Sequence, residues 1–274
     1  MKKFKFVNGV ITSDNKPFVM GIVNVTPDSF SDGGKYLSAL DAVFFARQLI
    51  AEGADIIDIG AMSTRPDSEP VTVNEEIERL RWVVDAVADC DCIVSVDTVN
   101  PETADYALRH GAQIINDVSG VFNEDMAQVV KRYNAGWIMT HTCNLPAGSD
   151  VHYENGVVNA VNEFFDDFLA KCDAFGIDRE RLCLDAGFGF SKSVQDNIDL
   201  LQNLDKVIRD DVFFLTALSR KRFIGALTGV ENPEERLVGT IVADLVALDK
   251  GSDILRVHDV DETRQSITIY NGIK

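Results

Sequence analysis

The chain has 274 residues, of which 46% are hydrophobic, and a formal net charge of −18. A nucleic-acid partner normally requires a basic surface, so this charge argues against one. No apolar stretch of about 18 residues is present, which argues against a membrane-spanning helix. The five cysteines lack the spacing of a zinc site and favour free thiols in a reducing cytoplasm. No linker of biased composition divides the chain, so we expect one domain over residues 1–274.

Alternating polar and apolar residues occupy positions 3–12, at the start of the chain. Asn8 and Gly9 lie in the middle of this segment, and both tolerate a positive φ angle. We therefore predict a short β-hairpin. It is expected to cover the bottom of the structure that follows and to have no role in chemistry.

Eight apolar runs, rich in β-branched residues, follow the hairpin, and each precedes a helical pattern. Such runs are typical of parallel strands that are buried on both faces. We predict strands over residues 18–23, 55–60, 92–96, 113–116, 136–140, 182–185, 212–216 and 253–258. The predicted helices cover residues 38–52, 74–89, a segment that begins at Asn100, and residues 124–133, 154–175, 194–205, 233–249 and 261–267.

Eight evenly distributed strand-helix units predict a fold of the α/β class, a (β/α)8 barrel. An open, doubly wound sheet with a similar helix count is the alternative. In a (β/α)8 barrel the active site lies at the carboxyl ends of the strands. Polar side chains stand at these ends in this chain: Asn24, Asp97, Asn116, Thr140, His141, Asp185, Thr216 and His258.

Two long polar loops follow the first two predicted strands. Asn24 precedes the first loop, and its amide oxygen is a suitable ligand for a hard cation. Gly33-Gly34 in that loop suits a mobile hinge, although a simple turn is the alternative. The second loop contains Ser63-Thr64-Arg65-Pro66, where an arginine beside two hydroxyls indicates an anion site. A solvated surface loop is the alternative for that segment.

Three further strand ends carry hydrogen-bond acceptors: Asp97, Asn116 and Asp185. Capping of the next helix is the alternative role for Asp97, but Asn100 already occupies the N-cap position. Three acceptors around one barrel opening would suit a heterocycle with several N–H donors. Such a site rejects analogues that leave its polar groups unpaired.

Basic groups stand at the last two strand ends, against an acidic background. Ser219-Arg220-Lys221-Arg222 follows the seventh strand, where Lys221 would reach the opening while Ser219 caps the next helix. A surface cluster of cations is the alternative. Arg256 and His258 lie on one face of the eighth strand by alternation, which predicts an anion clamp.

Several strings together closely resemble the dihydropteroate synthase family of pterin-binding enzymes. They span residues 20–260 in the expected order, which makes the resemblance highly specific. The strings are Gly-Ile-Val-Asn-Val-Thr-Pro-Asp-Ser-Phe-Ser-Asp-Gly-Gly (21–34), Glu-Gly-Ala-Asp-Ile-Ile-Asp-Ile-Gly (52–60), Ser-Thr-Arg-Pro (63–66), Ser-Val-Asp-Thr (95–98), Ile-Asn-Asp-Val-Ser-Gly (115–120), Ser-Arg-Lys (219–221) and Arg-Val-His-Asp-Val (256–260).

The resemblance implies a transferase of folate biosynthesis. It would join p-aminobenzoate to 6-hydroxymethyl-7,8-dihydropterin diphosphate and release diphosphate. The resemblance also implies a cytoplasmic homodimer and competition by sulfonamides at the p-aminobenzoate site. The implied site residues fall into three groups: Asp97, Asn116, Asp185 and Lys221 for the pterin; Asn24 with Mg²⁺, Thr64, Arg256 and His258 for the diphosphate; and Phe30, Arg65, Pro66, Phe190, Ser219 and Lys221 for p-aminobenzoate.

Several positions depart from the family pattern: Ala61, Met62, Thr140, Ala186, Ser191 and Ala217. Ser191 and Ala217 add side-chain atoms near the expected pterin and p-aminobenzoate sites, which would narrow the pocket, lower drug affinity or alter the substrate. Two alternatives follow, one being a non-catalytic or altered-substrate paralogue that binds a pterin. The other is a methyl-tetrahydrofolate-dependent methyltransferase, which is expected to lack the Ser-Thr-Arg-Pro loop and the Arg256/His258 pair.

Overall fold

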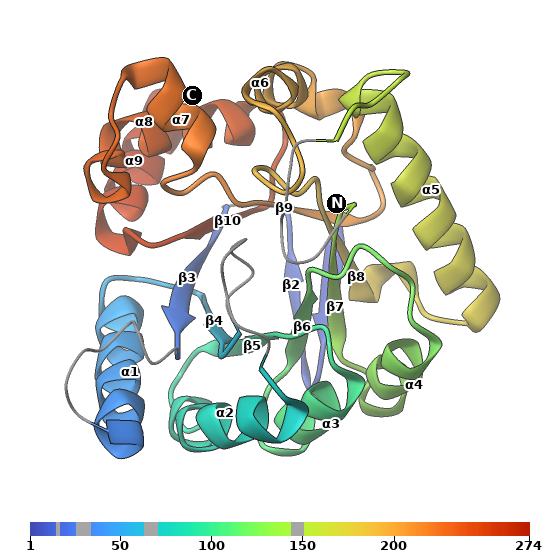
Figure 1. Cartoon of the computed structure of the whole chain (residues 1–274), viewed down its shortest axis with the longest axis vertical. Coiled ribbons are helices and arrows are strands. Elements are labelled where there is room, and N and C mark those ends of the chain that lie inside the picture. The colour runs from blue at the N-terminus through green and yellow to red at the C-terminus, as the bar shows by residue number, and fades with distance from the viewer. Residues whose placement is uncertain (15–16, 26–33, 63–70, 144–150) are drawn as a thin grey trace.

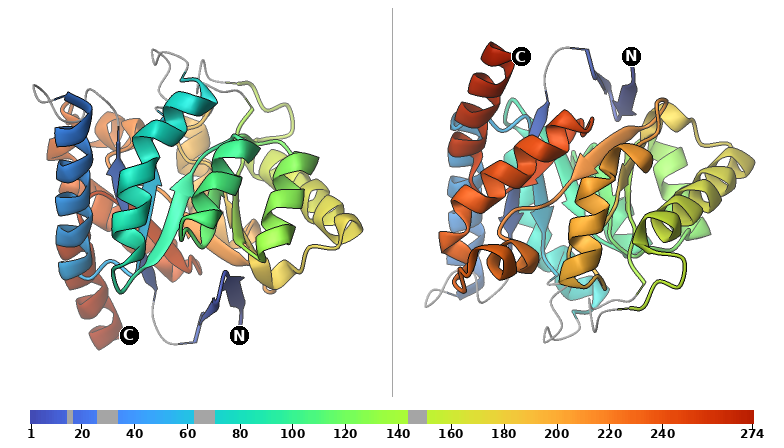
Figure 2. Two further views of the ribbon diagram at one scale, coloured as in Figure 1. Left: turned by 90° about the horizontal axis from the view of Figure 1, so that it is seen from below. Right: turned by 90° about the horizontal axis from the view of Figure 1, so that it is seen from above.

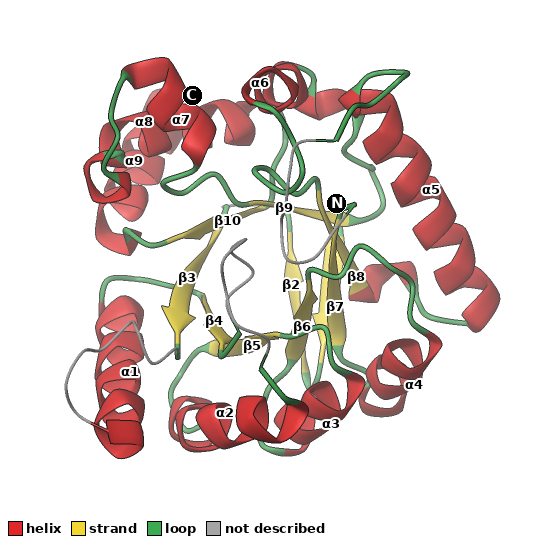
Figure 3. Ribbon diagram, viewed as in Figure 1, coloured by secondary structure: helices red, strands yellow, loops and turns green. Residues whose placement is uncertain are grey.

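The computed structural model of the chain describes residues 1–14, 17–25, 34–62, 71–143 and 151–274 (Figure 1). Eight parallel strands close into a barrel in the order β10-β3-β4-β5-β6-β7-β8-β9. Helices surround the strands on the outside (Figure 3). The prediction of a (β/α)8 barrel is confirmed, and the open sheet is wrong because β10 pairs with both β3 and β9.

The barrel strands begin and end within one residue of their predicted bounds. They are β3 (Phe18–Asn24), β4 (Ile56–Gly60), β5 (Ile93–Asp97), β6 (Ile114–Asp117), β7 (Gly136–Thr140), β8 (Leu182–Asp185), β9 (Phe213–Thr216) and β10 (Ile254–Val257). Nearly all of their residues are buried. Burial on both faces explains why these strands are continuous apolar runs in the sequence.

The helices differ from their predicted bounds more than the strands do. They are α1 (Gly34–Ala51), α2 (Val73–Ala88), α3 (Pro101–Arg109), α4 (Glu124–Tyr133), α5 (Val157–Phe175), α6 (Val194–Gln202), α7 (Arg222–Thr228), α8 (Leu237–Asp249) and α9 (Val260–Ile273). The seven-residue α7 was not predicted, because it is shorter than two helical turns and contains Gly225. A Cβ atom on Gly225 would lie 2.5 Å from Nε of Arg236 and 2.6 Å from the carbonyl oxygen of Val230, which explains the glycine.

The predicted helix over 233–249 consists of two parts. A 3₁₀ turn (Pro233–Glu235) precedes α8, and the N-cap of α8 is Arg236. The guanidinium of Arg236 donates to the carbonyl oxygens of Arg220 and Val230 at 3.0 Å. These bonds hold the connection between α7 and α8 in a bent path, which interrupts the helical pattern.

The amino-terminal hairpin closes the bottom of the barrel, as predicted. It pairs β1 (Lys3–Phe6) with β2 (Gly9–Thr12) and lies at one end of the barrel (Figure 2). The turn is formed by Val7 and Asn8, one residue earlier than predicted, and Asn8 has φ 57°. Gly9 pairs with Phe6 instead, and a Cβ atom there would lie 2.2 Å from the Phe6 ring.

The lower half of the barrel interior is an apolar cluster, which we call the floor. It contains Phe4, Phe6, Phe18, Met20, Ile56, Ile114, Ile138, Cys183, Phe213, Leu215, Ala217 and Ile254. Phe4 of the hairpin stacks on Phe213 of β9, with ring centroids 5.7 Å apart. The hairpin therefore supplies aromatic side chains to the interior of a barrel whose strands cannot fill it alone.

All five cysteines are free thiols, as predicted. The cytoplasmic location inferred from them stays a prediction. Within the described ranges, no helix combines the length and the apolar character that crossing a membrane would require.

Candidate active site

Polar side chains line the barrel interior at the carboxyl ends of the strands, an end that we call the mouth. Inward positions alternate along a strand, so each of these residues stands two positions beyond a member of the floor. The pairs are Ile56 and Asp58, Ile114 and Asn116, Ile138 and Thr140, Cys183 and Asp185, and Ile254 and Arg256. The barrel interior thus changes from apolar to polar over two residues along each of these strands.

Asp58 joins several strands in the mouth, and the strand-end pattern of the sequence did not point to it. Its fully buried carboxylate accepts from Ser95 Oγ at 2.6 Å, Asn116 Nδ2 at 2.9 Å and Arg256 Nε at 2.7 Å. A signal was present, because a charged residue in the middle of a buried strand must be paired. Asp58 therefore links β4 to β5, β6 and β10.

Arg256 crosses the mouth from β10 and is held by two carboxylates. Besides its bond to Asp58, its Nη2 donates to Asp97 Oδ2 at 3.0 Å. The Arg256 and Asp97 side chains keep 18% and 17% of their exposure, so both still reach solvent. Burial raises the pKa of the Asp97 carboxyl, and the Arg256 guanidinium opposes this shift. The predicted position of Asp97 in the mouth is confirmed, with Arg256 as its partner.

Asp185 lies at the end of β8 and is nearly fully buried. Its Oδ1 accepts from the backbone N–H of Gly187 at 2.8 Å, and its Oδ2 accepts from Thr140 Oγ1 at 3.5 Å. Burial raises the pKa of the Asp185 carboxyl, while the Gly187 bond and the charge of Lys221 oppose the rise. Thr140, one of the departures from the family pattern, thus adds a hydroxyl beside the predicted pterin acceptor Asp185.

Lys221 enters the same region from the end of β9. Its ammonium lies 4.9 Å from the ring centroid of Phe190, in the loop after β8. Burial lowers the pKa of Lys221 to about 8, and the charge of Asp185 opposes the shift. The structure therefore brings Lys221, Phe190 and Asp185 to one side of the mouth, as the prediction of a shared site requires.

His258 and Ser219 contact each other at the ends of β10 and β9. His258 Nδ1 and Ser219 Oγ are 2.9 Å apart, and the backbone N–H of His258 donates to the same hydroxyl at 3.2 Å. Ser219 does not cap the next helix as predicted, since α7 begins at Arg222 with Lys221 as its N-cap. Burial lowers the pKa of His258 to about 4, so its imidazole offers hydrogen bonds at neutral pH and Arg256 carries the charge.

Lys192 and His141 form a buried pair that the sequence analysis did not assign to the site. Lys192 Nζ lies 2.9 Å from His141 Nδ1, 3.2 Å from the His141 carbonyl oxygen and 3.0 Å from that of Gly187. Burial lowers the pKa of His141 to about 3, so its neutral ring accepts from the lysine. This contact fastens the end of β7 to the loop that carries Phe190.

The other predicted site residues and departures from the family pattern lie at the rim, in the floor, at the edge of the mouth or outside the described residues. Asn24 is the exposed last residue of β3, at the rim of the mouth. Phe30, Thr64, Arg65 and Pro66 lie outside the described residues. Ala217 belongs to the floor cluster. Ser191 is buried at φ 49°, and its hydroxyl has no hydrogen-bond partner among the described residues. Met62 is partly buried just after β4.

The arrangement combines acceptors with cations in a chain whose net charge is strongly negative. Asp97, Asn116 and Asp185 offer oxygens, while Arg256 and Lys221 offer positive charge. Such a mouth can hold a polar ring and an attached anion together, because a local positive group overcomes the general field. These five residues come from five of the eight barrel strands or the segments that follow them.

Comparison with known proteins shows the family to which the chain belongs. The family described as "Pterin binding enzyme" matches residues 20–258. The chain is 38% identical to "Dihydropteroate synthase" of Escherichia coli (strain K12), over 97% of this chain and 95% of that protein.

Solved structures of the same kind are also similar. Dihydropteroate synthase of Xanthomonas albilineans with 4-aminobenzoic acid is 41% identical, with a TM-score of 0.90 over 96% of this chain and 95% of that one. The Xanthomonas albilineans enzyme in complex with 7,8-dihydropteroate is 40% identical, with a TM-score of 0.87 over 97% of both chains. The chain therefore belongs to the family of pterin-binding enzymes, among the dihydropteroate synthases.

Proposed function

We propose that the chain condenses 6-hydroxymethyl-7,8-dihydropterin diphosphate with p-aminobenzoate, giving 7,8-dihydropteroate and diphosphate. The observation that carries this proposal is the polar layer of the mouth, where buried acceptors stand beside Arg256 and Lys221. Relatives with more than a third of their residues identical are named for this activity. The activity makes the chain a transferase.

In this proposal the pterin ring lies deep in the mouth. Asp97, Asn116 and Asp185 accept hydrogen bonds from its N–H groups, and Lys221 donates to its acceptors. The floor below these residues is apolar and filled, so the ring rests on it without access to water from beneath. Buried polar groups that are paired only by the correct ring provide specificity.

The diphosphate group is assigned to the rim, at Asn24, Thr64, Arg256 and His258. Mg²⁺ is assigned to Asn24, whose amide supplies one oxygen ligand. Among the described residues, no group of three His, Cys, Asp or Glu side chains could hold a metal. This donor set fits an ion that takes its other ligands from the substrate phosphates and water, as Mg²⁺ often does. When bound, Mg²⁺ would neutralise charge on the leaving diphosphate.

The p-aminobenzoate site is assigned to Phe30, Arg65, Pro66, Phe190, Ser219 and Lys221. Of these residues, Phe190 and Lys221 contact each other in the structure, and Ser219 contacts His258. An aromatic ring beside a cation suits a benzoate ring with its carboxylate. Sulfonamides, which have a similar shape, would compete for this site.

The chemistry needs no nucleophilic side chain. The bond between the exocyclic carbon of the pterin and the diphosphate oxygen breaks, and its electron pair leaves with the diphosphate. The amine nitrogen of p-aminobenzoate then forms the new bond to that carbon and loses a proton. Arg256 is placed to stabilise charge on the departing group, and the electron-rich pterin supports positive charge on the carbon.

Diphosphate release tests the proposal. Purified protein is mixed with the pterin diphosphate, with and without p-aminobenzoate and Mg²⁺, and diphosphate is measured in a coupled assay. Release that requires all components and forms dihydropteroate is the expected result. Absence of release while the pterin still binds would contradict the proposal and favour the non-catalytic paralogue.

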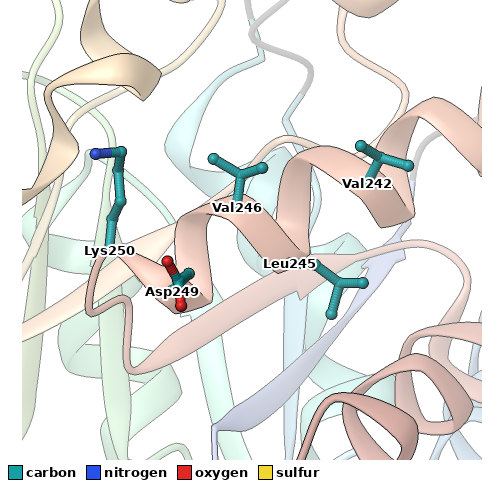
Figure 4. A pocket seen from close by; sticks show the side chains of 5 residues that line it. All are labelled: Val242, Leu245, Val246, Asp249 and Lys250. Carbon is teal, nitrogen blue, oxygen red and sulfur yellow. The ribbon is translucent and has the colours of Figure 1, made fainter. Parts of the chain in front are cut away.

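A homodimer is the proposed assembly, and an apolar face of α8 supports it. Val238, Val242 and Val246 recur every fourth residue and are 76%, 58% and 40% exposed. Val242 and Val246 project from one side of the helix and border a hollow of about 310 Å³ (Figure 4). A stable two-fold interface buries such a face on both copies. Sedimentation equilibrium is expected to show a dimer, which Val242→Asp weakens and Val121→Asp, on a distant exposed valine, does not.

A further inference from the structure

The amide of Asn116 has a defined orientation in the mouth. Its Nδ2 donates to Asp58 Oδ2 at 2.9 Å, whereas its Oδ1 is buried without a hydrogen-bond partner among the described residues. A carboxylate oxygen only accepts, so the NH₂ side of the amide must be the one that faces Asp58. The unpaired oxygen is then left for a ligand, because buried polar groups in folded proteins are normally paired.

Asp58 is itself fixed by two other residues. Arg256 Nε donates to Asp58 Oδ2 at 2.7 Å, and Ser95 Oγ donates to Oδ1 at 2.6 Å. A guanidinium has only donors, so the Oδ2 position must be an acceptor whatever else changes. Donors hold both oxygens of Asp58, which fixes the plane of the carboxylate and the direction of the Asn116 amide that donates to it.

We propose that Asp58 is a specificity-determining positioning residue. It fixes Asn116 so that the mouth presents an acceptor to the ring of the substrate, and it selects rings that offer an N–H donor at that place. The inference rests on the proposed function, since it concerns how a pterin is distinguished from related rings. Asp58 acts through Asn116 and does not itself carry out chemistry.

Two ring types differ in the relevant property. A pterin carries an amino group at position 2, which donates hydrogen bonds. A lumazine carries a carbonyl oxygen there, which accepts them. The fixed oxygen of Asn116 pairs with the first and opposes the second. Without Asp58, the amide is free to rotate and present its NH₂ group, so the discrimination is lost.

The test is calorimetric binding of 6-hydroxymethylpterin and 6-hydroxymethyllumazine, neither of which carries a diphosphate. The wild-type protein is expected to prefer the pterin by about tenfold or more, the usual effect of one hydrogen bond that is made or opposed. Asp58→Ala is expected to reduce this ratio to near one. A ratio is the readout because a general loss of stability lowers both affinities and leaves their ratio unchanged.

Asp58→Asn is the matched control. Arg256 requires an acceptor at the Oδ2 position, so the new amide places its oxygen there and its nitrogen toward Ser95 Oγ. Asn116 then keeps its partner, and the variant is expected to retain the wild-type ratio although the charge is gone. Asn116→Ala is expected to lose the ratio, and adding Asp58→Ala to it is expected to change the ratio no further.

The outcomes separate this inference from the proposed function. A wild-type ratio in folded Asp58→Ala, or a lost ratio in Asp58→Asn, overturns the inference while the proposed function stands. If Asp58→Ala does not fold, Asp58→Asn and Asn116→Ala decide the matter by the same ratio. Wild-type protein that binds neither ring overturns the proposed function as well, before any variant is measured.

Discussion

The floor and the mouth of the barrel are built by the same strands, yet one is held together by apolar packing and the other by polar contacts. The floor is a cluster of apolar side chains, two of them phenylalanines from the hairpin. The mouth consists of charged and amide side chains that depend on one another for hydrogen bonds. Close packing of the floor residues stabilises the fold. Mutual pairing keeps the mouth polar without a large cost in free energy of unfolding.

The difference shows how one barrel can be both stable and open to a substrate. Some groups in the mouth have partners that a ligand can replace, such as the Asp97 carboxylate on Arg256, and the Asn116 oxygen has no partner among the described residues. The apolar side chains of the floor offer no hydrogen bonds to a polar ligand, so we expect no ligand to bind there. Changes in the floor should therefore affect stability, and changes in the mouth should affect binding.

Phe4→Ala is the change expected to have the largest effect on stability. Phe4 is fully buried and stacks on Phe213, so its truncation should lower the free energy of unfolding by about 3–5 kcal/mol. Urea unfolding measures this loss. Phe44→Ala, on a phenylalanine that is 66% exposed on α1, is the control and should change it little. If the floor takes a direct part in binding, folded Phe4→Ala will have a raised KM for the pterin diphosphate. That result would contradict the division into a stabilising floor and a binding mouth.

Arg256→Ala tests the mouth. Removing the guanidinium deprives the proposed diphosphate of a charged partner, which costs about 2–5 kcal/mol of binding, so the affinity for the pterin diphosphate should fall roughly a hundredfold. Stability should fall too, because Asp58 loses its cation. Calorimetry at a temperature where circular dichroism shows a folded protein measures the affinity. Arg132→Ala, on an exposed arginine of α4, should leave affinity unchanged. Equal affinity in both variants would remove Arg256 from the diphosphate site.

Sequence patterns were sufficient for the barrel and for most of the described site. Buried parallel strands leave long apolar runs, and their polar ends mark the mouth, as Asp97, Asn116 and Asp185 show. The bonds of Asp97 to Arg256 and of Asn116 to Asp58 were not predictable, because they join strands far apart in the chain. Arg256 and His258 were interpreted as an anion clamp, which stays a prediction; the ion pairs of Arg256 with Asp58 and Asp97 were not foreseen.

Two omissions have particular causes. Asp58 lies in the middle of an apolar strand, so a pattern of polar strand ends does not include it. Alternation nevertheless places it on the same face as Ile56. The helix α7 has only seven residues and begins within a run of basic residues, so no helical period was visible. Ser219 was assigned as the cap of the next helix although no helix range was predicted there, and its hydroxyl contacts His258 instead.

Asp244→Leu sharpens the comparison with a buried carboxyl outside the mouth. Asp244 on α8 is 1% exposed, and neither of its oxygens has a hydrogen-bond partner among the described residues. A buried polar group without a partner costs about 1–3 kcal/mol, so the variant should be more stable than the wild type by about 2 kcal/mol at pH 8. Thermal unfolding measures the gain. Asp167→Leu, on an exposed aspartate of α5, is the control and should give none.

The pH dependence of this gain has a definite sign. Burial raises the pKa of Asp244 well above its ordinary value of 3.8, so the folded protein binds a proton that the unfolded chain has lost. Stability from this group is thus fully present at low pH and is lost as the pH rises from 3.8 towards the raised pKa. The advantage of Asp244→Leu should grow over that range. A gain that is constant with pH would mean that Asp244 keeps an ordinary pKa in the folded protein.

Ser191→Gly is expected to have the smallest effect, because it corrects a local cost at the edge of the mouth. Ser191 adopts φ 49°, which favours glycine, and its buried hydroxyl has no partner among the described residues. Glycine removes the cost of the positive φ and the cost of the unpaired hydroxyl, but it also makes the unfolded chain more flexible. The net result should be a rise of about 1 kcal/mol in the free energy of unfolding. Asn134→Gly separates the two contributions, since Asn134 has φ 52° at the end of α4 but is not a buried hydroxyl. A larger gain at Ser191 than at Asn134 assigns the excess to the hydroxyl. A loss of stability at Ser191 would instead show that its hydroxyl makes a stabilising contact, so that this edge of the mouth is paired as the Asp58 carboxylate is.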